Sequence, residues 1–456
     1  MDSGVVPDTI VALATAPGFG AIALVRLSGG GALRIAAELT GESASATAAW
    51  AERTSHLRTL SRPGSGEALD RALVTVYRAP ASYTGEDMVE ISTHGGHSIP
   101  GNVVAACIAL GARNARPGEF TERAYLNGKL DLTQAEAVAD LVAARSEKGR
   151  AVALHQLERG LGARIAALRE SVVGLAALLV QHIDFPEEDD APTPLDAIAG
   201  RAADVARDMG VILDTAPSGE LLREGAVTVL AGRPNSGKSS LFNALVGQER
   251  AIVTDVPGTT RDAIEAVVEV DGFPFRLVDT AGLRGDAGAV ERLGIEVARR
   301  YLAGADVVLH CREAGRAAGR REEEFLASVG SPVIVVRTKW DLAGAGEVPR
   351  DGEVAVSVES GEGLAELRGM LRGFVFQGIV ENRDEVPVVT NRRQAELLRV
   401  ARAEVEAFAE ALSAEIPPEV ASAHLKSAES ALEEILGVIA PDDVLDRVFS
   451  DFCIGK

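Results

Sequence analysis

The sequence predicts a multidomain protein in which an α/β domain is inserted between two halves of an α-helical domain, behind an α+β N-terminal part. Short apolar runs with Gly and Pro breakers fill the first part of the chain. Long Ala/Leu/Glu/Arg-rich stretches with few breakers, typical of helices, occupy two separate segments. Apolar strand-type runs, each followed by a loop motif, lie between these segments. We expect an N-terminal domain over residues 1–128, a helical domain over 129–222 and 380–456, and the inserted domain over 223–379.

Length and composition fit this organisation. A chain of 456 residues with 46% hydrophobic residues is expected to form two or three domains, because single cores seldom grow so large. Its net charge of −21 repels nucleic-acid phosphates at long range, so RNA binding would need a local basic patch or a basic partner. The three cysteines show no disulfide or zinc spacing. No apolar stretch is long enough to span a bilayer, and we expect a cytoplasmic protein without membrane association.

Alternating apolar runs predict four strands and one helix in the N-terminal part. The expected strands are 9–14, 21–27, 72–77 and 88–92, and the expected helix is 99–110. Three polar residues stand out among these elements, namely Arg26, Glu90 and Lys129. The residues alone name no ligand for this part, and Arg26 and Glu90 are equally compatible with solvent-exposed strand ends.

Helix-type composition runs from Leu132 to about Leu222 and resumes after about residue 378. Within the second segment we expect helices over 394–411 and 420–438. A domain inserted between two helical halves could pass a movement of its loops directly into the helices that carry it.

The inserted part opens with an apolar run and the motif Gly-Arg-Pro-Asn-Ser-Gly-Lys-Ser, which ends at Ser239. This GxxxxGK[ST] pattern, placed between a strand and a helix, is typical of a loop that binds a polyphosphate with backbone N–H groups. Lys238 is expected between the β- and γ-phosphates, and the Ser239 hydroxyl on Mg²⁺. The other loop residues expected at the nucleotide are Asn235, Ser236, Gly237 and Ser240.

Three further motifs follow apolar strand-type runs in the order of a Ras-like GTPase domain. They are Asp279-Thr280-Ala281-Gly282, Thr338-Lys339-Trp340-Asp341 and Ser357-Val358-Glu359. Asp279 can hold a water of the Mg²⁺ shell, while the Gly282 backbone reaches the γ-phosphate. A carboxylate at Asp341 accepts from guanine N1–H and N2–H₂ but repels the matching edge of adenine, so the site is expected to select GTP over ATP.

The first switch is expected over residues 251–262, with Thr260 as the second Mg²⁺ ligand and Thr259 as the alternative. Leu283 follows Gly282 and cannot orient a water molecule. Glu291 is the nearest acid for that task, although it fits a solvent-exposed helix start equally well. Asn235, together with backbone carbonyls of the switch loop, could hold a monovalent cation such as K⁺.

With these residues in place, the chain resembles the MnmE (TrmE) family of tRNA-modification GTPases over nearly its whole length. Beyond the GTPase motifs, the resemblance rests on segments 82–87, 115–124, 127–136 and 221–225 and on the terminal Phe452-Cys453-Ile454-Gly455-Lys456. Two departures occur: Thr338 stands where the family's motif has Asn, and Ser357-Val358 where Ser-Ala is usual.

This resemblance implies a K⁺-activated GTP hydrolase that works as a homodimer. It also implies a flavin-dependent MnmG-type partner, with which the dimer forms a heterotetramer. Together they would add a carboxymethylaminomethyl or aminomethyl group to carbon 5 of the wobble uridine of certain tRNAs. The N-terminal domain would mediate dimerisation and bind a tetrahydrofolate derivative, in the 5-formyl or 5,10-methylene form, as one-carbon donor.

Site roles follow from the same resemblance, position by position. The implied folate contacts are Arg26, Glu90, Lys129 and Lys456, and the implied K⁺ ligands are Asn235, Thr254, Val256 and Thr259. Lys238 and Glu291 take the catalytic roles, with Glu291 orienting water. Cys453 belongs to the terminal motif and is a candidate for the tRNA-modification step, a buried inert thiol being the alternative.

Two other functions remain open on the sequence. One is a regulatory or ribosome-assembly GTPase switch without one-carbon chemistry, and the other is a folate-dependent enzyme with a vestigial GTPase domain. Absence of folate binding would favour the GTPase switch over a tRNA-modification GTPase. Absence of GTP turnover would favour the folate-dependent enzyme.

Overall fold

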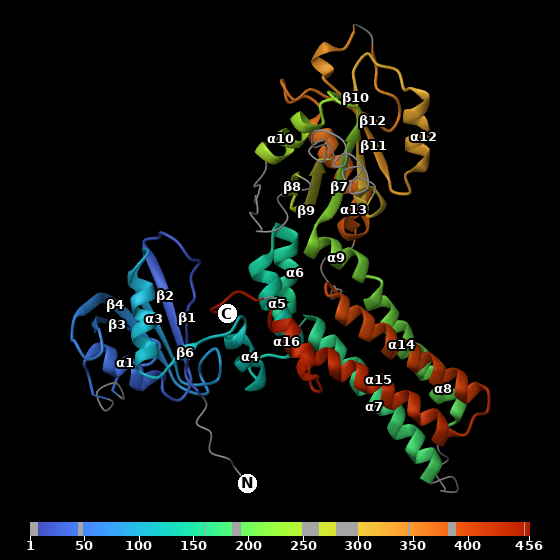
Figure 1. The fold of residues 1–456 in the computed structure, drawn as a ribbon. Coiled ribbons are helices and arrows are strands. Elements are labelled where there is room, and N and C mark those ends of the chain that lie inside the picture. Colours follow the sequence, from blue (N-terminus) through green and yellow to red (C-terminus); the bar gives the residue numbers. More distant parts are fainter. Residues whose placement is uncertain are drawn as a thin grey trace, which may run out of the picture. The chain divides into compact units, whose positions relative to one another are not determined.

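The computed structural model describes residues 8–43, 49–158, 160–184, 193–248, 264–279, 300–344, 347–381, 389–450 and 452–456. The chain divides into two compact units, Met1–Ala139 with Glu433–Lys456, and Asp140–Leu432 (Figure 1). The last part of the chain thus belongs with the N-terminal unit. The three domain boundaries expected from the sequence remain a prediction.

A six-stranded sheet forms the centre of the first unit, in the order β3-β4-β5-β2-β1-β6. The strands are β1 (Ile10–Leu13), β2 (Ile22–Ser28), β3 (Ser55–Ser61), β4 (Ala68–Tyr77), β5 (Met88–His94) and β6 (Arg113–Asn114). Alternate residues such as Val25, Leu27, Val89 and Ile91 are buried in one core with α1 (Ala32–Thr40) and α3 (Ile99–Ala109). Period-two burial of this kind is typical of a sheet with one covered face, and the predicted α+β architecture is confirmed.

Helices α4 (Glu119–Leu126), α16 (Asp442–Ser450) and the start of α5 (Leu132–Ala143) complete this unit. Gly118, at a left-handed φ of 68°, lies where a Cβ would come within 2.7 Å of the Phe449 carbonyl oxygen. A Cβ on Gly455 would come equally close to Leu13 and Ala14, at 2.7 Å. The C-terminal tail is therefore packed against β1, and glycine is needed for the close approach.

The helical part of the second unit contains α6 (Glu147–Leu157), α7 (Gly160–Asp184), α8 (Leu195–Leu213), α9 (Ala216–Glu224), α14 (Arg392–Ser413) and α15 (Pro418–Leu436). Helix α8 packs along α14 (Figure 1). Ile198, Ala202, Ala206 and Met209 recur at helical spacing and are buried on α8. The predicted helices over 394–411 and 420–438 agree with α14 and α15 to within two residues at each end.

The second sheet has the order β12-β11-β10-β7-β9-β8 and is parallel except for β8, which pairs antiparallel with β9. Its strands are β7 (Ala226–Gly232), β8 (Ile264–Val270), β9 (Phe273–Asp279), β10 (Val307–Glu313), β11 (Val333–Thr338) and β12 (Glu353–Val356). Leucines of α10 (Lys238–Gln248) and α13 (Leu364–Glu381) join its main core. Phe325 of α12 (Arg320–Ser328) packs in a separate cluster. The carboxyl ends of β7, β9, β10 and β11 meet at one edge, where α/β sheets bind ligands.

The turn between β8 and β9 completes the N-terminus of α6. The backbone N–H of Lys148 donates to the Gly272 carbonyl oxygen at 3.0 Å, and that of Glu147 donates to Glu269 Oε2 at 3.0 Å. Phe376 of α13 stacks on Phe273 of β9, with ring centroids 4.6 Å apart. The sheet is thus joined to the helical part by direct contacts.

None of the described helices has the length and hydropathy of a membrane-spanning segment.

Candidate nucleotide-binding site

The loop between β7 and α10 has the geometry of a phosphate-binding loop. Gly232 has a φ of 140°, and a Cβ there would collide with the Cys311 carbonyl oxygen of β10. Gly237 has a φ of 85° and immediately precedes the first residue of α10. Both glycines therefore have backbone conformations that side chains rarely adopt. The loop ends at a helix N-terminus, whose N–H groups and dipole attract anions.

Lys238 lies inside this loop and is only 6% exposed. Its Nζ donates to the carbonyl oxygens of Gly232 at 3.1 Å and Arg233 at 2.8 Å. The ammonium group is thus held at the loop where a polyphosphate would lie. Burial raises the pKa of the neighbouring Cys311 thiol to about 12, so this cysteine stays neutral and contributes no competing charge.

Ser239, in the first turn of α10, lies beside Asp279, the last residue of β9. The Ser239 hydroxyl donates to Asp279 Oδ2 at 2.8 Å, and Asp279 is 1% exposed. Hydroxyl and carboxylate oxygens are the ligands that Mg²⁺ prefers, directly or through a bound water. The two residues that the sequence assigned to the Mg²⁺ site therefore lie together, and their donor set fits that ion.

The base-binding loops lie at the ends of β11 and β12. Ser357 donates its hydroxyl hydrogen to Asp341 Oδ1 at 2.7 Å. Lys339, at a left-handed φ of 55°, forms an ion pair of 2.7 Å with Glu313 at the end of β10. This hydrogen bond from Lys339 lowers the pKa of the Glu313 carboxyl. Asp341 is thus oriented by a buried serine before any base binds.

The remaining predicted residues divide into two sets. Asn235 is exposed at a left-handed φ of 62°, Ser240 is exposed on α10, and Trp340 begins a short 3₁₀ turn that contains Asp341. Val358 and Glu359 follow β12 directly. The following predicted residues lie outside the described part of the chain: Thr254, Val256, Thr259, Thr260, Thr280, Ala281, Gly282 and Glu291. Their roles stay predictions.

Arg26 and Glu90 face each other across β2 and β5 in the first unit. Arg26 Nη2 lies 2.7 Å from Glu90 Oε1, and the guanidinium lies over the Tyr83 and Phe120 rings at 5.6 and 5.7 Å. Arg26 Nη1 also donates to the carbonyl oxygen of Gly455 at 3.1 Å. The alternative that Arg26 and Glu90 are solvent-exposed strand ends is therefore wrong, since their side chains are only 16% and 20% exposed.

Lys456 and Lys129 also lie in the first unit, where each forms a hydrogen bond with the backbone. The Lys456 carbonyl oxygen accepts from the Phe120 N–H at 3.2 Å, and Lys129 Nζ donates to the Pro80 carbonyl oxygen at 3.1 Å. Cys453 is exposed, so the alternative of a buried inert thiol is wrong for this residue. Its chemical role remains a prediction.

Sequence reasoning missed two partners of these residues. Tyr77 donates its hydroxyl hydrogen to Glu90 Oε2 at 3.2 Å, and Gly455 binds Arg26 through its backbone. The alternation of residues predicts strands that contain Tyr77 and Glu90. Their contact depends on the pairing of β4 with β5, in which Thr75 lies opposite Glu90. The sequence alone does not give this register. The family resemblance assigns Arg26 and Lys456 to one folate site, but it does not give the hydrogen bond between Arg26 and Gly455.

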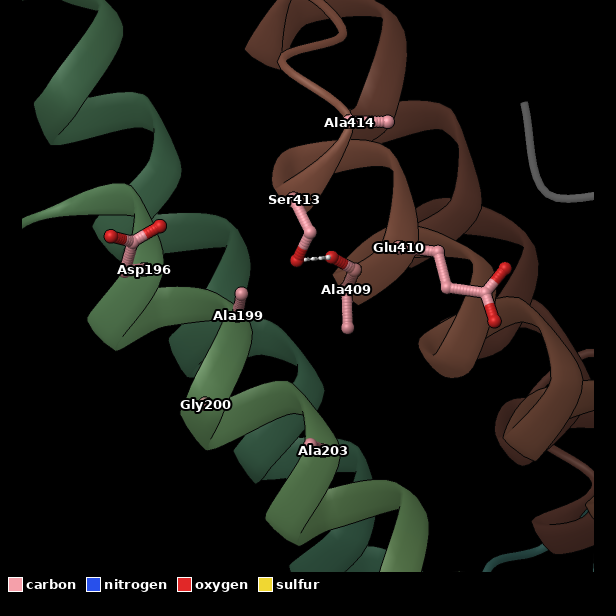
Figure 2. Close-up of a pocket in the computed structure, with 8 residues that line it drawn as sticks. All are labelled: Asp196, Ala199, Gly200, Ala203, Ala409, Glu410, Ser413 and Ala414. Atoms are coloured by element: carbon pink, nitrogen blue, oxygen red, sulfur yellow. Dashed lines mark hydrogen bonds between the residues drawn. The ribbon is translucent and has the colours of Figure 1, made fainter.

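A groove with a volume of about 610 Å³ lies between α8 and α14 in the second unit. Figure 2 shows its small side chains, including Ala199, Ala203 and Ala409, with Asp196 and Glu410 at its sides. Ser413 donates its hydroxyl hydrogen within its own helix, to the Ala409 carbonyl oxygen at 2.9 Å. None of the predicted site residues lines this groove.

The sheet edge, phosphate loop and oriented Asp341 define a P-loop GTP-binding protein. A family model described as the GTP-binding protein TrmE N-terminus matches residues 9–129, and one for the MnmE helical domain matches residues 132–453. The chain belongs to the MnmE family of tRNA-modification GTPases, and it is a GTP hydrolase of tRNA modification.

Relatives of nearly the same length support this assignment. The tRNA modification GTPase MnmE of Heliobacterium modesticaldum is 40% identical, with 99% of this chain and 100% of that protein covered. The protein of the same name from Moorella thermoacetica is 42% identical, with 98% and 99% covered. Among solved structures, the G domain of the T. maritima FeoB iron transporter is 28% identical, covering 33% of this chain and 98% of that chain. Its TM-score of 0.25 is too low to support a conclusion.

Proposed function

We propose that this GTP hydrolase is activated by K⁺ and acts as a homodimer with a flavin-dependent MnmG-type partner. Its reaction would serve the addition of a carboxymethylaminomethyl or aminomethyl group to carbon 5 of the wobble uridine in certain tRNAs. The observation that carries the hydrolase part is the convergence of Lys238, the Ser239–Asp279 pair and Asp341 at one edge of a parallel sheet. The related proteins are tRNA-modification GTPases by name, which supports tRNA as the partner.

The described residues account for binding of the nucleotide. Lys238 and the loop N–H groups hold the β- and γ-phosphates, while Asp341 accepts from the Watson–Crick edge of guanine. Ser239 and Asp279 would hold Mg²⁺, which when bound neutralises charge on the transferred phosphoryl group. Thr260, or Thr259 in its place, is proposed as the second Mg²⁺ ligand. Glu291 is proposed to orient the attacking water.

Potassium activation depends on Asn235. Asn235 is a residue of the phosphate loop with a left-handed φ and an exposed side chain, and an amide oxygen suits K⁺. The proposed partners in the cation site are the backbone carbonyls of Thr254 and Val256 together with Thr259. The cation would supply positive charge near the β- and γ-phosphates, where negative charge develops during hydrolysis.

A tetrahydrofolate derivative fits the first unit. Glu90 is 20% exposed and can accept hydrogen bonds, as the amide and amine groups of a pterin require. Lys129 and Lys456 are cations suited to the carboxylates of a glutamate tail, whereas Arg26 is ion-paired with Glu90 and belongs to the pterin end. When bound, the folate would supply the one-carbon unit. The chain's own residues orient it through the Arg26–Glu90 pair.

Coupling between hydrolysis and the helical part is supported by the β8–β9 turn. This turn accepts hydrogen bonds from the first N–H groups of α6. Strand β8 begins just after the segment assigned to the first switch, and β9 ends at Asp279, just before the predicted loop of Gly282. A shift of either strand would therefore act on the N-terminus of α6.

The hydrolysis, K⁺ and folate parts of the proposal are tested by GTP turnover measured in KCl, NaCl and RbCl, together with equilibrium dialysis against a reduced folate. We expect faster turnover in KCl than in NaCl, loss of turnover in Lys238→Ala, and folate binding that Arg26→Ala weakens. Absence of folate binding with normal turnover would favour a GTPase switch without one-carbon chemistry. Folate binding without turnover would favour a vestigial GTPase domain.

A further inference from the structure

Thr338 connects the base-binding loop to the phosphate-binding loop. It ends β11, is 2% exposed, and donates its hydroxyl hydrogen to the Ser236 carbonyl oxygen at 2.7 Å. Its side-chain atoms lie only 3.2 to 3.5 Å from the position of a Cβ on Gly237. Thr338 therefore packs directly on the phosphate loop and holds one of its carbonyl groups.

The hydroxyl of threonine carries one hydrogen, and here that hydrogen is committed to Ser236. A threonine hydroxyl can accept further hydrogen bonds but has no second proton to donate. An asparagine amide carries two N–H donors and could serve the loop carbonyl with one of them while offering the other to a ligand. The residue type at this position thus decides whether a donor remains for the nucleotide.

The two anchors of the nucleotide fix which part of the base passes Thr338. The phosphates lie at the loop that contains Ser236, and Asp341 takes the N1–H and N2–H₂ edge of guanine. Thr338 contacts that loop and stands three residues before Asp341. The base must span these two anchors, and N7 is a ring acceptor on the edge of guanine next to the one that Asp341 takes.

We propose that Thr338 is a specificity-determining residue that braces the phosphate loop and offers no proton to guanine N7. The site therefore reads guanine through Asp341 and is indifferent to the atom at position 7 of the base. Its expected ligands include guanine nucleotides in which N7 is replaced by C–H. This inference rests on the proposed GTP site. It adds that the site tolerates a C–H group in place of N7 of guanine, which GTPase activity alone does not imply.

The test compares GDP with 7-deaza-GDP by competition against a fluorescent guanine nucleotide, with diphosphates used so that turnover does not interfere. For the unaltered protein we expect the two dissociation constants to agree within about twofold. Asn at this position restores a donor, so Thr338→Asn is expected to raise the ratio of 7-deaza-GDP to GDP dissociation constants about fivefold, the effect of one added hydrogen bond.

Thr338→Val is the matched control, because it keeps the shape and removes the hydroxyl. Both nucleotides should bind more weakly to it by the same factor, since only the loop brace is lost. A ratio of about fivefold or more in the unaltered protein would overturn the proposal. An unchanged ratio in Thr338→Asn would do so as well, because it would place N7 away from this residue. Failure of GDP itself to bind would instead contradict the GTP site.

Discussion

Ser357 donates a hydrogen bond of 2.7 Å to Asp341 Oδ1, and Ser357 itself is fully buried. The Ser357 hydroxyl in turn accepts from the Ser360 N–H at 3.3 Å. A carboxylate held in this way needs little reordering when it accepts from guanine, which favours binding because less conformational freedom is lost. Base selection therefore depends on a pair of residues from two different strand ends.

Asp341→Asn is expected to shift the preference from guanine to xanthine nucleotides, because the asparagine amide offers a donor to the carbonyl of xanthine at position 2. Ser357→Ala is expected to weaken GDP binding about fivefold, since Asp341 loses its orienting hydrogen bond. Competition titrations with GDP and XDP measure both effects. Ser328→Ala, at an exposed position of α12, is the control. Unchanged GDP affinity in Asp341→Asn would contradict the assignment of this carboxylate.

Asn235→Ala is expected to remove the advantage of K⁺ over Na⁺ in GTP turnover while leaving GDP affinity nearly unchanged. The reason is that Asn235 offers an exposed amide oxygen, whereas the nucleotide is held by Lys238 and the loop backbone. Turnover in matched KCl and NaCl solutions provides the measurement. Equal rates of the unaltered protein in the two salts would rule out the cation site.

Glu269→Ala is expected to lower the free energy of unfolding of the second unit by about 1 kcal/mol, as loss of a helix N-terminal acceptor does. Glu269 Oε2 accepts from the Glu147 N–H at the first turn of α6. Denaturant titration checks this value, with Glu406→Ala on α14 as a control that loses only an exposed ion pair with Arg402. Equal effects of both substitutions would show that the β8–β9 turn does not stabilise α6.

The first unit is expected to lose stability in acid through Glu119. Burial alone would raise the pKa of this carboxyl, but hydrogen bonds from Arg113, the Arg116 N–H and Arg123 lower it to about 2, from an ordinary value of 4.5. A group with a depressed pKa stabilises the folded state above its unfolded pKa. That contribution is lost as the pH falls from 4.5 toward 2.

Glu119→Gln is accordingly expected to lower the stability of this unit at neutral pH and to flatten its acid dependence. Fluorescence of Trp50, which is 6% exposed in the N-terminal core, follows the unfolding in a Trp340→Phe background. Identical pH slopes with and without the substitution would exclude Glu119 as a source of the acid sensitivity.

Much of the fold follows from local patterns. The predicted strands over 9–14 and 21–27 agree with β1 and β2 to within one residue at each end. These segments have strong apolar periodicity bounded by breakers, which is the most reliable sequence signal. The phosphate loop, Asp279 and Asp341 were also predicted, because their motifs follow such strands directly.

Other parts could not be predicted because they depend on contacts between distant residues. Strand β3 was not predicted, because its residues are largely polar and at least partly exposed. Helix α1 was not predicted either, because it lies in an Ala-rich stretch. The tie between Arg26 and Gly455 joins residues 429 positions apart. The Thr338 hydrogen bond to Ser236 was likewise invisible, because it joins residues 102 positions apart.

The most direct measurement is a crystal structure of the protein with a non-hydrolysable GTP analogue and Mg²⁺. We expect the polyphosphate to be wrapped by residues 232–239, with Lys238 at its β- and γ-phosphates and guanine N1 and N2 on Asp341. A polyphosphate bound elsewhere in the molecule, or a guanine edge turned away from Asp341, would contradict this expectation.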